Sequence, residues 1–172
     1  IWFTIRGFTA PIFMFVSGVT FTYLLRFQSL PFFENPRVKK GVHRFLVLLV
    51  IAYLLRFPTY RMFDFSEVDH GQWLTFFTVD ALHLIAFGIL FIIIMSYIAE
   101  KYKRSDYLIF SLGAAFFFFM FLLTEKINWA NFLPIPFAAY LYQGTGSYFP
   151  LFPWAGYVIS GALLGSYLAK NP

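Results

Sequence analysis

The sequence contains no cysteine among its 172 residues. Disulfide bonds, thiolate metal sites and cysteine nucleophiles are therefore excluded for this chain. Charged residues are also scarce, at 12%, whereas soluble domains average about 25%. Hydrophobic residues make up 60% of the chain and aromatic residues 24%, so there are too few charged side chains to cover a surface in contact with water. These proportions are typical of an integral membrane protein.

Long uncharged runs alternate with short segments that carry the charges. A helix needs about 20 residues, at about 1.5 Å each, to cross about 30 Å of hydrocarbon. The sequence therefore predicts an all-α membrane protein, a polytopic helical bundle with about five transmembrane helices in a single domain. We expect the spans at residues 8–27, 42–60, 78–99, 107–124 and 153–169. Because Ile1 is not an initiator residue, we expect the chain to be part of a longer protein.

The basic residues are distributed unevenly between the two sides of this expected bundle. Nine of the 13 Lys and Arg residues lie in or beside the connections 28–41 and 100–106 or at the carboxyl terminus, which all fall on one side. The positive-inside rule places that side in the cytoplasm. This topology accounts for the net charge of +5, so we expect membrane lipid and no nucleic acid as a partner.

A carboxylate and an imidazole, Asp80 and His83, lie three residues apart in the third expected span. On a helix this spacing puts them on one face, where they can form a general-base pair. Ionisable groups at membrane depth tend to be functional because their burial is costly. The alternative interpretation is structural. In that case Thr78 caps the helix, Asp80 interacts with the helix dipole, and His83 bonds a neighbouring helix.

Arg56 follows Arg44 by twelve residues in the second expected span. This separation is about 18 Å along a helix, which is less than the thickness of the hydrocarbon layer. Either both side chains extend outward to the membrane surfaces, or the helix continues past Arg56 towards Pro58. In the second case the Arg56 guanidinium lies in a polar cavity inside the bundle, where it could hold an anionic group.

A basic patch on the expected cytoplasmic side contains Arg37, Lys39 and Lys40, with His43 and Arg44 close by. Such a patch can bind the phosphates of a nucleotide-like cofactor or the headgroups of anionic lipids. It also satisfies the positive-inside rule without any ligand. The sequence leaves these three interpretations open.

Gly161 and Gly165 lie four residues apart on the last expected span, with Ala169 one turn later. A row of small residues forms a shallow groove that another helix can approach closely. The row predicts close helix packing, and a helix–helix oligomer can form through Gly161 and Gly165.

The two expected external loops carry weaker signals. Segment 64–70 contains three acidic residues and a histidine that could bind a cation, but their spacing matches no EF-hand pattern. Segment 126–152 is rich in Pro, Gly and aromatic residues, which suit either the membrane interface or stacking on sugar faces. No metal site is predicted from either loop.

Three stretches together resemble the heparan-alpha-glucosaminide N-acetyltransferase-like family. Residues 9–19, TAPIFMFVSGV, resemble the opening of that family's second span. Residues 148–165 contain YFPLFPWAGY followed by SGALLG, which resemble a later span of the family. Residues 80–86, DALHLIA, are similar to an element in which glutamine is frequent at the position of His83. The order and spacing of the three stretches fit across nearly the whole chain.

The resemblance implies a bundle that transfers acetyl from cytosolic acetyl-CoA to an amino sugar or glycan on the external side. Under this hypothesis Asp80 and His83 line the external mouth as catalytic residues, and Arg37, Lys39 and Lys40 bind the phosphates of acetyl-CoA. The family's usual histidine would precede Ile1, so no residue of this chain is assigned that role. The resemblance also implies a bacterial inner membrane as the location.

Two other functions are compatible with the same residues. A proton-coupled transporter of a small polar solute would use Asp80 and His83 as a proton relay, with Arg56 in the pathway. A non-catalytic membrane scaffold would pack through Gly161 and Gly165, and would tolerate changes at the polar pair.

Overall fold

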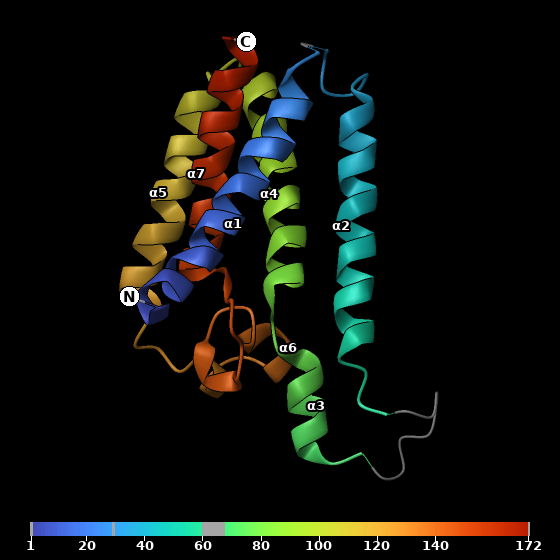
Figure 1. Cartoon of the computed structure of the whole chain (residues 1–172), viewed down its shortest axis with the longest axis vertical. Coiled ribbons are helices and arrows are strands. Elements are labelled where there is room, and N and C mark those ends of the chain that lie inside the picture. Colours follow the sequence, from blue (N-terminus) through green and yellow to red (C-terminus); the bar gives the residue numbers. More distant parts are fainter. Residues whose placement is uncertain (1, 29, 60–67, 172) are drawn as a thin grey trace.

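The computed structural model describes residues 2–28, 30–59 and 68–171, and it is helical throughout (Figure 1). No strand occurs within these ranges, so the predicted all-α class is confirmed. The helices are α1 (Trp2–Arg26), α2 (Pro36–Leu55), α3 (His70–Phe77), α4 (Ala81–Lys101), α5 (Asp106–Thr124), α6 (Ile135–Ala138) and α7 (Leu151–Lys170). Two short 3-10 turns, Trp129–Asn131 and Gln143–Thr145, lie between α5 and α7.

Within the described ranges, four helical segments are long and apolar enough to cross a membrane. They are Phe8–Arg26 within α1, His70–Lys101 comprising α3 and α4, α5, and α7. α2 was expected as a fifth span but does not belong to this group. It has a similar length, but its first nine positions contain four basic residues, which lower its mean hydropathy.

α2 also occupies different residues from the expected span 42–60. It begins six residues earlier because Asn35 caps it and Pro36 occupies its first position, a favoured place for proline. The Asn35 side chain accepts a hydrogen bond from the Arg37 N–H (2.9 Å) and donates one to the Leu25 carbonyl (2.7 Å). The expected connection 28–41 is therefore shorter, since residues from Pro36 onward are helical.

The two basic connections lie at the same end of the bundle, at the top of Figure 1, which we call the basic end. There, the Glu100 carboxylate accepts the Phe32 N–H (3.0 and 3.1 Å) and fastens the α1–α2 connection to α4. α3 and α6 mark the opposite end, called the far end. This arrangement agrees with the expected topology, and the cytoplasmic location of the basic end stays a prediction.

α1 and α7 form the most extensive helix pair, and they cross at glycines. A Cβ atom at Gly161 would overlap the Phe15 carbonyl, and one at Gly18 would overlap the Val158 carbonyl. Gly165 is similarly close to the backbone of α1. The predicted close packing thus takes place within the chain. α1 would have to move before a second copy could use this groove, and the oligomer stays a prediction.

A charged cluster joins the basic ends of α1, α5 and α7. Arg26 Nη2 lies 2.6 Å from Asp106 Oδ1, and both side chains are largely buried. Asp106 Oδ2 accepts the Ser166 hydroxyl (3.4 Å) and lies 3.6 Å from Lys170 Nζ. Arg26 also donates to the Ser96 carbonyl of α4 (3.4 Å). A single carboxylate therefore connects helices that are distant in sequence.

Replacing Asp106 with alanine should destabilise the bundle by about 3 kcal/mol, the lower end of the range for breaking a buried ion pair. The loss arises because Arg26 keeps its charge in a largely buried position without its carboxylate partner. Thermal unfolding in detergent, followed by tryptophan fluorescence, measures the change. The double variant Arg26→Met, Asp106→Leu should recover most of the stability. An Asp106→Ala protein as stable as the parent would contradict this role.

Candidate functional site

The junction between α3 and α4 places the polar residues of the far end. Asp80 caps α4: its Oδ1 accepts the N–H groups of Leu82 (3.0 Å) and His83 (3.3 Å). The expectation that Thr78 caps this helix is wrong, because Thr78 terminates α3 instead. Between them, the Val79 N–H donates to Ser147 Oγ (3.1 Å). These bonds fix both the start of α4 and its position against the segment before α7.

His83 is fully buried in the first turn of α4. Its Nδ1 lies 3.0 Å from Asp80 Oδ1 and 3.4 Å from the Asp80 backbone nitrogen. The shorter contact, to a carboxylate, favours a proton on Nδ1, and this tautomer leaves a lone pair on Nε2. Nε2 is buried and has no hydrogen-bond partner among the described residues. A buried imidazole with one nitrogen held and the other free is suited to accept a proton.

Arg56 meets Asp80 from the end of α2. Its Nε lies 3.3 Å from Asp80 Oδ2, and about a fifth of each side chain is exposed. α2 ends at Leu55, so the helix does not continue to Pro58 as the second interpretation of this arginine required. The guanidinium lies at an open polar pocket at the far end, and not in a cavity inside the bundle as that interpretation predicted. Asp80 therefore holds His83 with one oxygen and Arg56 with the other.

Two tyrosines cover His83 from different parts of the chain. Tyr53 in α2 and Tyr140, which follows α6, share a hydrogen bond between their hydroxyls (2.8 Å). Their ring centroids lie 4.6 Å and 6.1 Å from that of His83, and both rings are nearly perpendicular to the imidazole. Burial raises the pKa of Tyr140, and the hydrogen bond with Tyr53 raises it further. The phenol of Tyr140 therefore stays protonated, and either hydroxyl of the pair can be the donor.

An open pocket of about 740 Å³ lies beside this cluster, between the end of α2, α3 and the start of α4. Its polar lining comprises Arg56, Asp69, Gln72, Thr75 and Asp80. The described part of the lining contains two carboxylates and one guanidinium, an excess of one negative charge that a cationic group could balance. The amide of Gln72 and the hydroxyl of Thr75 add partners for ligand hydroxyls. The pocket thus suits a polar molecule that carries an amine.

The other residues predicted for a site lie elsewhere. Arg37, Lys39 and Lys40 are in the first turns of α2 at the basic end, remote from Asp80 and His83. Residues 64–67 of the acidic loop segment fall outside the described ranges, and Asp69 caps α3 by accepting the Gly71 N–H (3.2 Å). Within the described ranges, no three His, Asp or Glu side chains come together as a metal site.

The sequence indicated Asp80 and His83 but missed the tyrosine pair. Tyr140 belongs to the aromatic-rich segment 126–152, for which the sequence suggested only an interface or sugar-stacking role. No sequence pattern indicated a role for Tyr53. The two hydroxyls meet across 87 positions of sequence. Spacing along a helix reveals pairs such as Asp80 and His83, but it carries no information on contacts of such long range.

The family comparison covers nearly the whole chain. The family model described as "Heparan-alpha-glucosaminide N-acetyltransferase, catalytic" matches residues 1–171. Comparisons with curated proteins and with solved structures give no match. The family match accords with the motifs at residues 9–19, 80–86 and 148–165, and with the membrane-length helices. The chain belongs to the family of the heparan-alpha-glucosaminide N-acetyltransferase catalytic domain.

Proposed function

We propose that this protein transfers an acyl group, acetyl in the simplest case, from cytoplasmic acyl-CoA to an amino sugar or glycan at the external face of a bacterial inner membrane. The observation that carries the proposal is His83, fully buried with Nε2 free, held by Asp80 beside a pocket suited to an amine. Family membership supports acetyl transfer and does not favour a transporter or a scaffold.

The reaction requires a base for the attacking amine. The amine nitrogen attacks the carbonyl carbon of the thioester, a C–N bond forms, and the C–S bond breaks. Coenzyme A leaves as a thiolate, which then takes up the proton that was removed from the amine. In our proposal His83 Nε2 accepts the proton that the amine loses, since a nitrogen that remains an ammonium ion has no lone pair for attack. Asp80 positions the imidazole and stabilises the imidazolium that forms.

The buried position of His83 requires a movement before an acceptor can reach it. The pocket is lined by Asp80 and Arg56, whereas His83 has no exposed surface. Tyr53 and Tyr140 cover the imidazole and belong to separate segments. In our proposal, the acceptor binds in the pocket through its amine and hydroxyls, and separation of the two phenols brings it to Nε2.

The described residues do not form a clear binding site for the acyl donor, acyl-CoA. Arg37 and Lys40 line a groove of only about 10 Å³, and Lys39 does not contribute to it. The three residues therefore do not enclose a nucleotide. Their predicted role in binding the phosphates of acyl-CoA stays a prediction, and we derive no step through it. The basic end as a whole supplies the positive charge that would attract such a donor.

A transfer assay with the full-length protein in lipid vesicles tests the proposal. We expect radiolabel from acetyl-CoA to appear on the nitrogen of glucosamine-type acceptors, and glucose, which lacks the amine, to stay unlabelled. Absence of both transfer and acetyl-CoA binding would refute the proposal. Uptake of intact solute driven by a pH gradient, without consumption of acetyl-CoA, would instead establish a transporter.

A further inference from the structure

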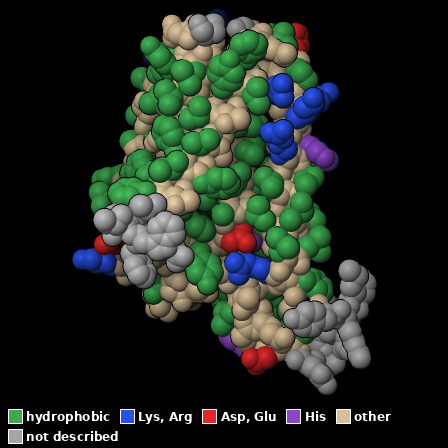
Figure 2. Space-filling view, viewed as in Figure 1, with side chains coloured by type: hydrophobic (Ala, Val, Ile, Leu, Met, Phe, Trp, Pro, Cys, Tyr) green, Lys and Arg blue, Asp and Glu red, His purple; other side chains and the backbone are tan. Residues whose placement is uncertain are grey.

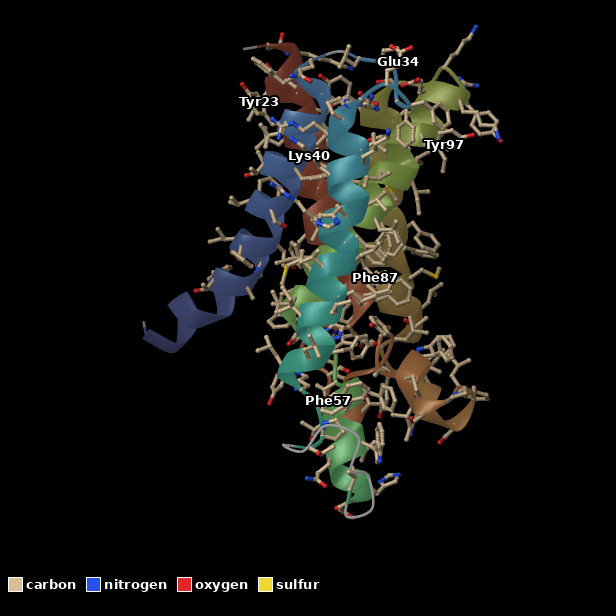
Figure 3. The ribbon with its side chains drawn as sticks, turned by 90° about the vertical axis from the view of Figure 1, so that its right-hand side faces the viewer. Tyr23, Glu34, Lys40, Phe57, Phe87 and Tyr97 are labelled. Carbon is tan, nitrogen blue, oxygen red and sulfur yellow. The ribbon has the colours of Figure 1, made fainter. Side chains whose placement is uncertain are left out.

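Three basic residues form one face of α2 at the basic end. Arg37, Lys40 and Arg44 follow one another at spacings of three and four residues, which aligns them along the helix. They line a shallow groove against Phe21 and Leu24 of α1. Figure 2 shows basic side chains gathered over the upper part of α2 on an otherwise largely hydrophobic surface, and in Figure 3 Lys40 lies on the α1 side of the helix. We call these three residues the basic face.

The basic face lacks a carboxylate partner in the part of the chain that the structure describes. The ion pairs found there involve Asp80 and Asp106, and none includes a residue of the basic face. Glu34, the acidic residue of the connection before α2, makes no ion pair with it either. Arg44 lies about 12 Å along the helix from Pro36, so its charge reaches well below the end of the helix. A negative group from outside these segments would compensate the three positive charges.

The same face becomes apolar towards the far end. Val47, Ile51 and Leu54 continue the spacing of three and four residues, and all three are exposed. α1 leans away from α2 in this direction in both views (Figures 1 and 3), and α1 and α2 have few contacts. α2 therefore presents a stripe with cations at the basic end and exposed apolar side chains below them.

We infer that this stripe of α2 binds an anionic phospholipid, with its phosphate on Arg37, Lys40 and Arg44 and its acyl chains along Val47, Ile51 and Leu54. A phospholipid has the same order of groups, an anionic phosphate followed by hydrocarbon chains. Coenzyme A also carries phosphates, but the arm that follows them contains polar amides, which do not match an apolar stripe. The two ligands would compete for Arg37 and Lys40, so one experiment can decide between them.

Native mass spectrometry of the full-length protein in detergent tests the site, with phosphatidylglycerol, phosphatidylcholine and coenzyme A as probes. We expect phosphatidylglycerol to bind and zwitterionic phosphatidylcholine to bind much more weakly. The variant Arg37→Gln, Lys40→Gln, Arg44→Gln should bind phosphatidylglycerol about 100-fold more weakly, since each basic residue near a membrane surface contributes about 1 kcal/mol. The control Lys101→Gln, Lys103→Gln, Arg104→Gln removes the same charge at the same end, and we expect it to bind like the parent.

If both triple variants lose the same affinity for phosphatidylglycerol, the binding depends only on the total positive charge of this end, and the inference is overturned. Unchanged binding in the first variant would overturn it as well. Displacement of the lipid by coenzyme A, with coenzyme A binding lost in the same variant, would assign the face to the acyl donor instead. If the triple variant does not fold, Arg44→Gln alone should still weaken phosphatidylglycerol binding several-fold, while Arg44→Lys should retain it. The readout is lipid binding, so it is independent of the proposed acyl transfer.

Discussion

Replacing His83 with glutamine should lower the rate of acyl transfer by about 10²–10⁴-fold, the usual contribution of a general base. Glutamine has a similar reach and can bond to Asp80, but it cannot accept the proton that the amine loses. We expect His83→Ala to be equally inactive. Both variants should still bind acetyl-CoA, because the proposal gives His83 a proton to accept and no part in holding the donor. Single-turnover transfer of radiolabelled acetyl to glucosamine measures the rate.

The glutamine variant separates catalysis from structure. Glutamine is a good helix former of similar length to histidine, so the substitution should fit the fold. If His83→Gln retains the parental rate while His83→Ala loses it, the side chain at this position only stabilises the start of α4 and packs against Tyr53. His83 would then not be the general base. Asp80→Asn is a companion variant, because it keeps a cap oxygen and removes the charge. Under our proposal it slows transfer without the loss of folded protein that a broken cap would cause.

The membrane helices could be predicted from the sequence because lipid imposes a simple rule. A segment in hydrocarbon must satisfy its own backbone hydrogen bonds, so long apolar runs become helices. α5 illustrates this, since its apolar run lies between charged residues at Asp106 and Glu125. α2 was harder, because its first turns are basic. The signal for its start was the Asn35–Pro36 pair, an N-cap residue followed by proline at the first helical position.

The short helix α3 was not predicted from the sequence, although its capping residues are present there. Residues 70–77 precede Thr78 in what we expected to be an external loop, yet they form a helix. Asp69 and Gln72 make a reciprocal capping box: the Asp69 N–H donates to Gln72 Oε1 (2.8 Å), and Asp69 Oδ2 accepts the Gly71 N–H (3.2 Å). This signature was readable, but the acidic residues around it suggested a solvated loop.

The candidate site combines a local pattern with contacts that the sequence cannot reveal. Asp80 and His83 were predictable from their spacing on one helix. Arg56, at the end of α2, is the partner of Asp80 and lies 24 positions away in the sequence. Whether the Arg56 side chain lies at the membrane surface or in a cavity depended on where α2 ends. Pro58 is a local signal for the end of α2, but the contact of Arg56 with Asp80 joins distant segments and has no such signal.

Replacing Gly161 with leucine should prevent α1 and α7 from packing and cost more than about 3 kcal/mol, above the usual range for overpacking. A side chain at this position would meet the backbone of α1 at Phe15, and a backbone cannot rotate out of the way as a side chain can. The two helices would have to separate along a crossing that also depends on Gly18 and Gly165. We expect most of the protein to be lost as aggregate in size-exclusion chromatography after detergent extraction.

Smaller substitutions on α7 test the same prediction more stringently. Gly161→Ala adds a single carbon and should already lower the unfolding temperature clearly. Gly156→Ala is the matched control, because a Cβ there meets only the ring of Phe118 at 3.0 Å, and a ring can shift by a few tenths of an ångström. Equal unfolding temperatures for Gly161→Ala and the parent would mean that α1 and α7 are not in backbone contact. The Gly161–Gly165 groove would then be open to a second copy, and the expected oligomer through it would become the better interpretation of these glycines.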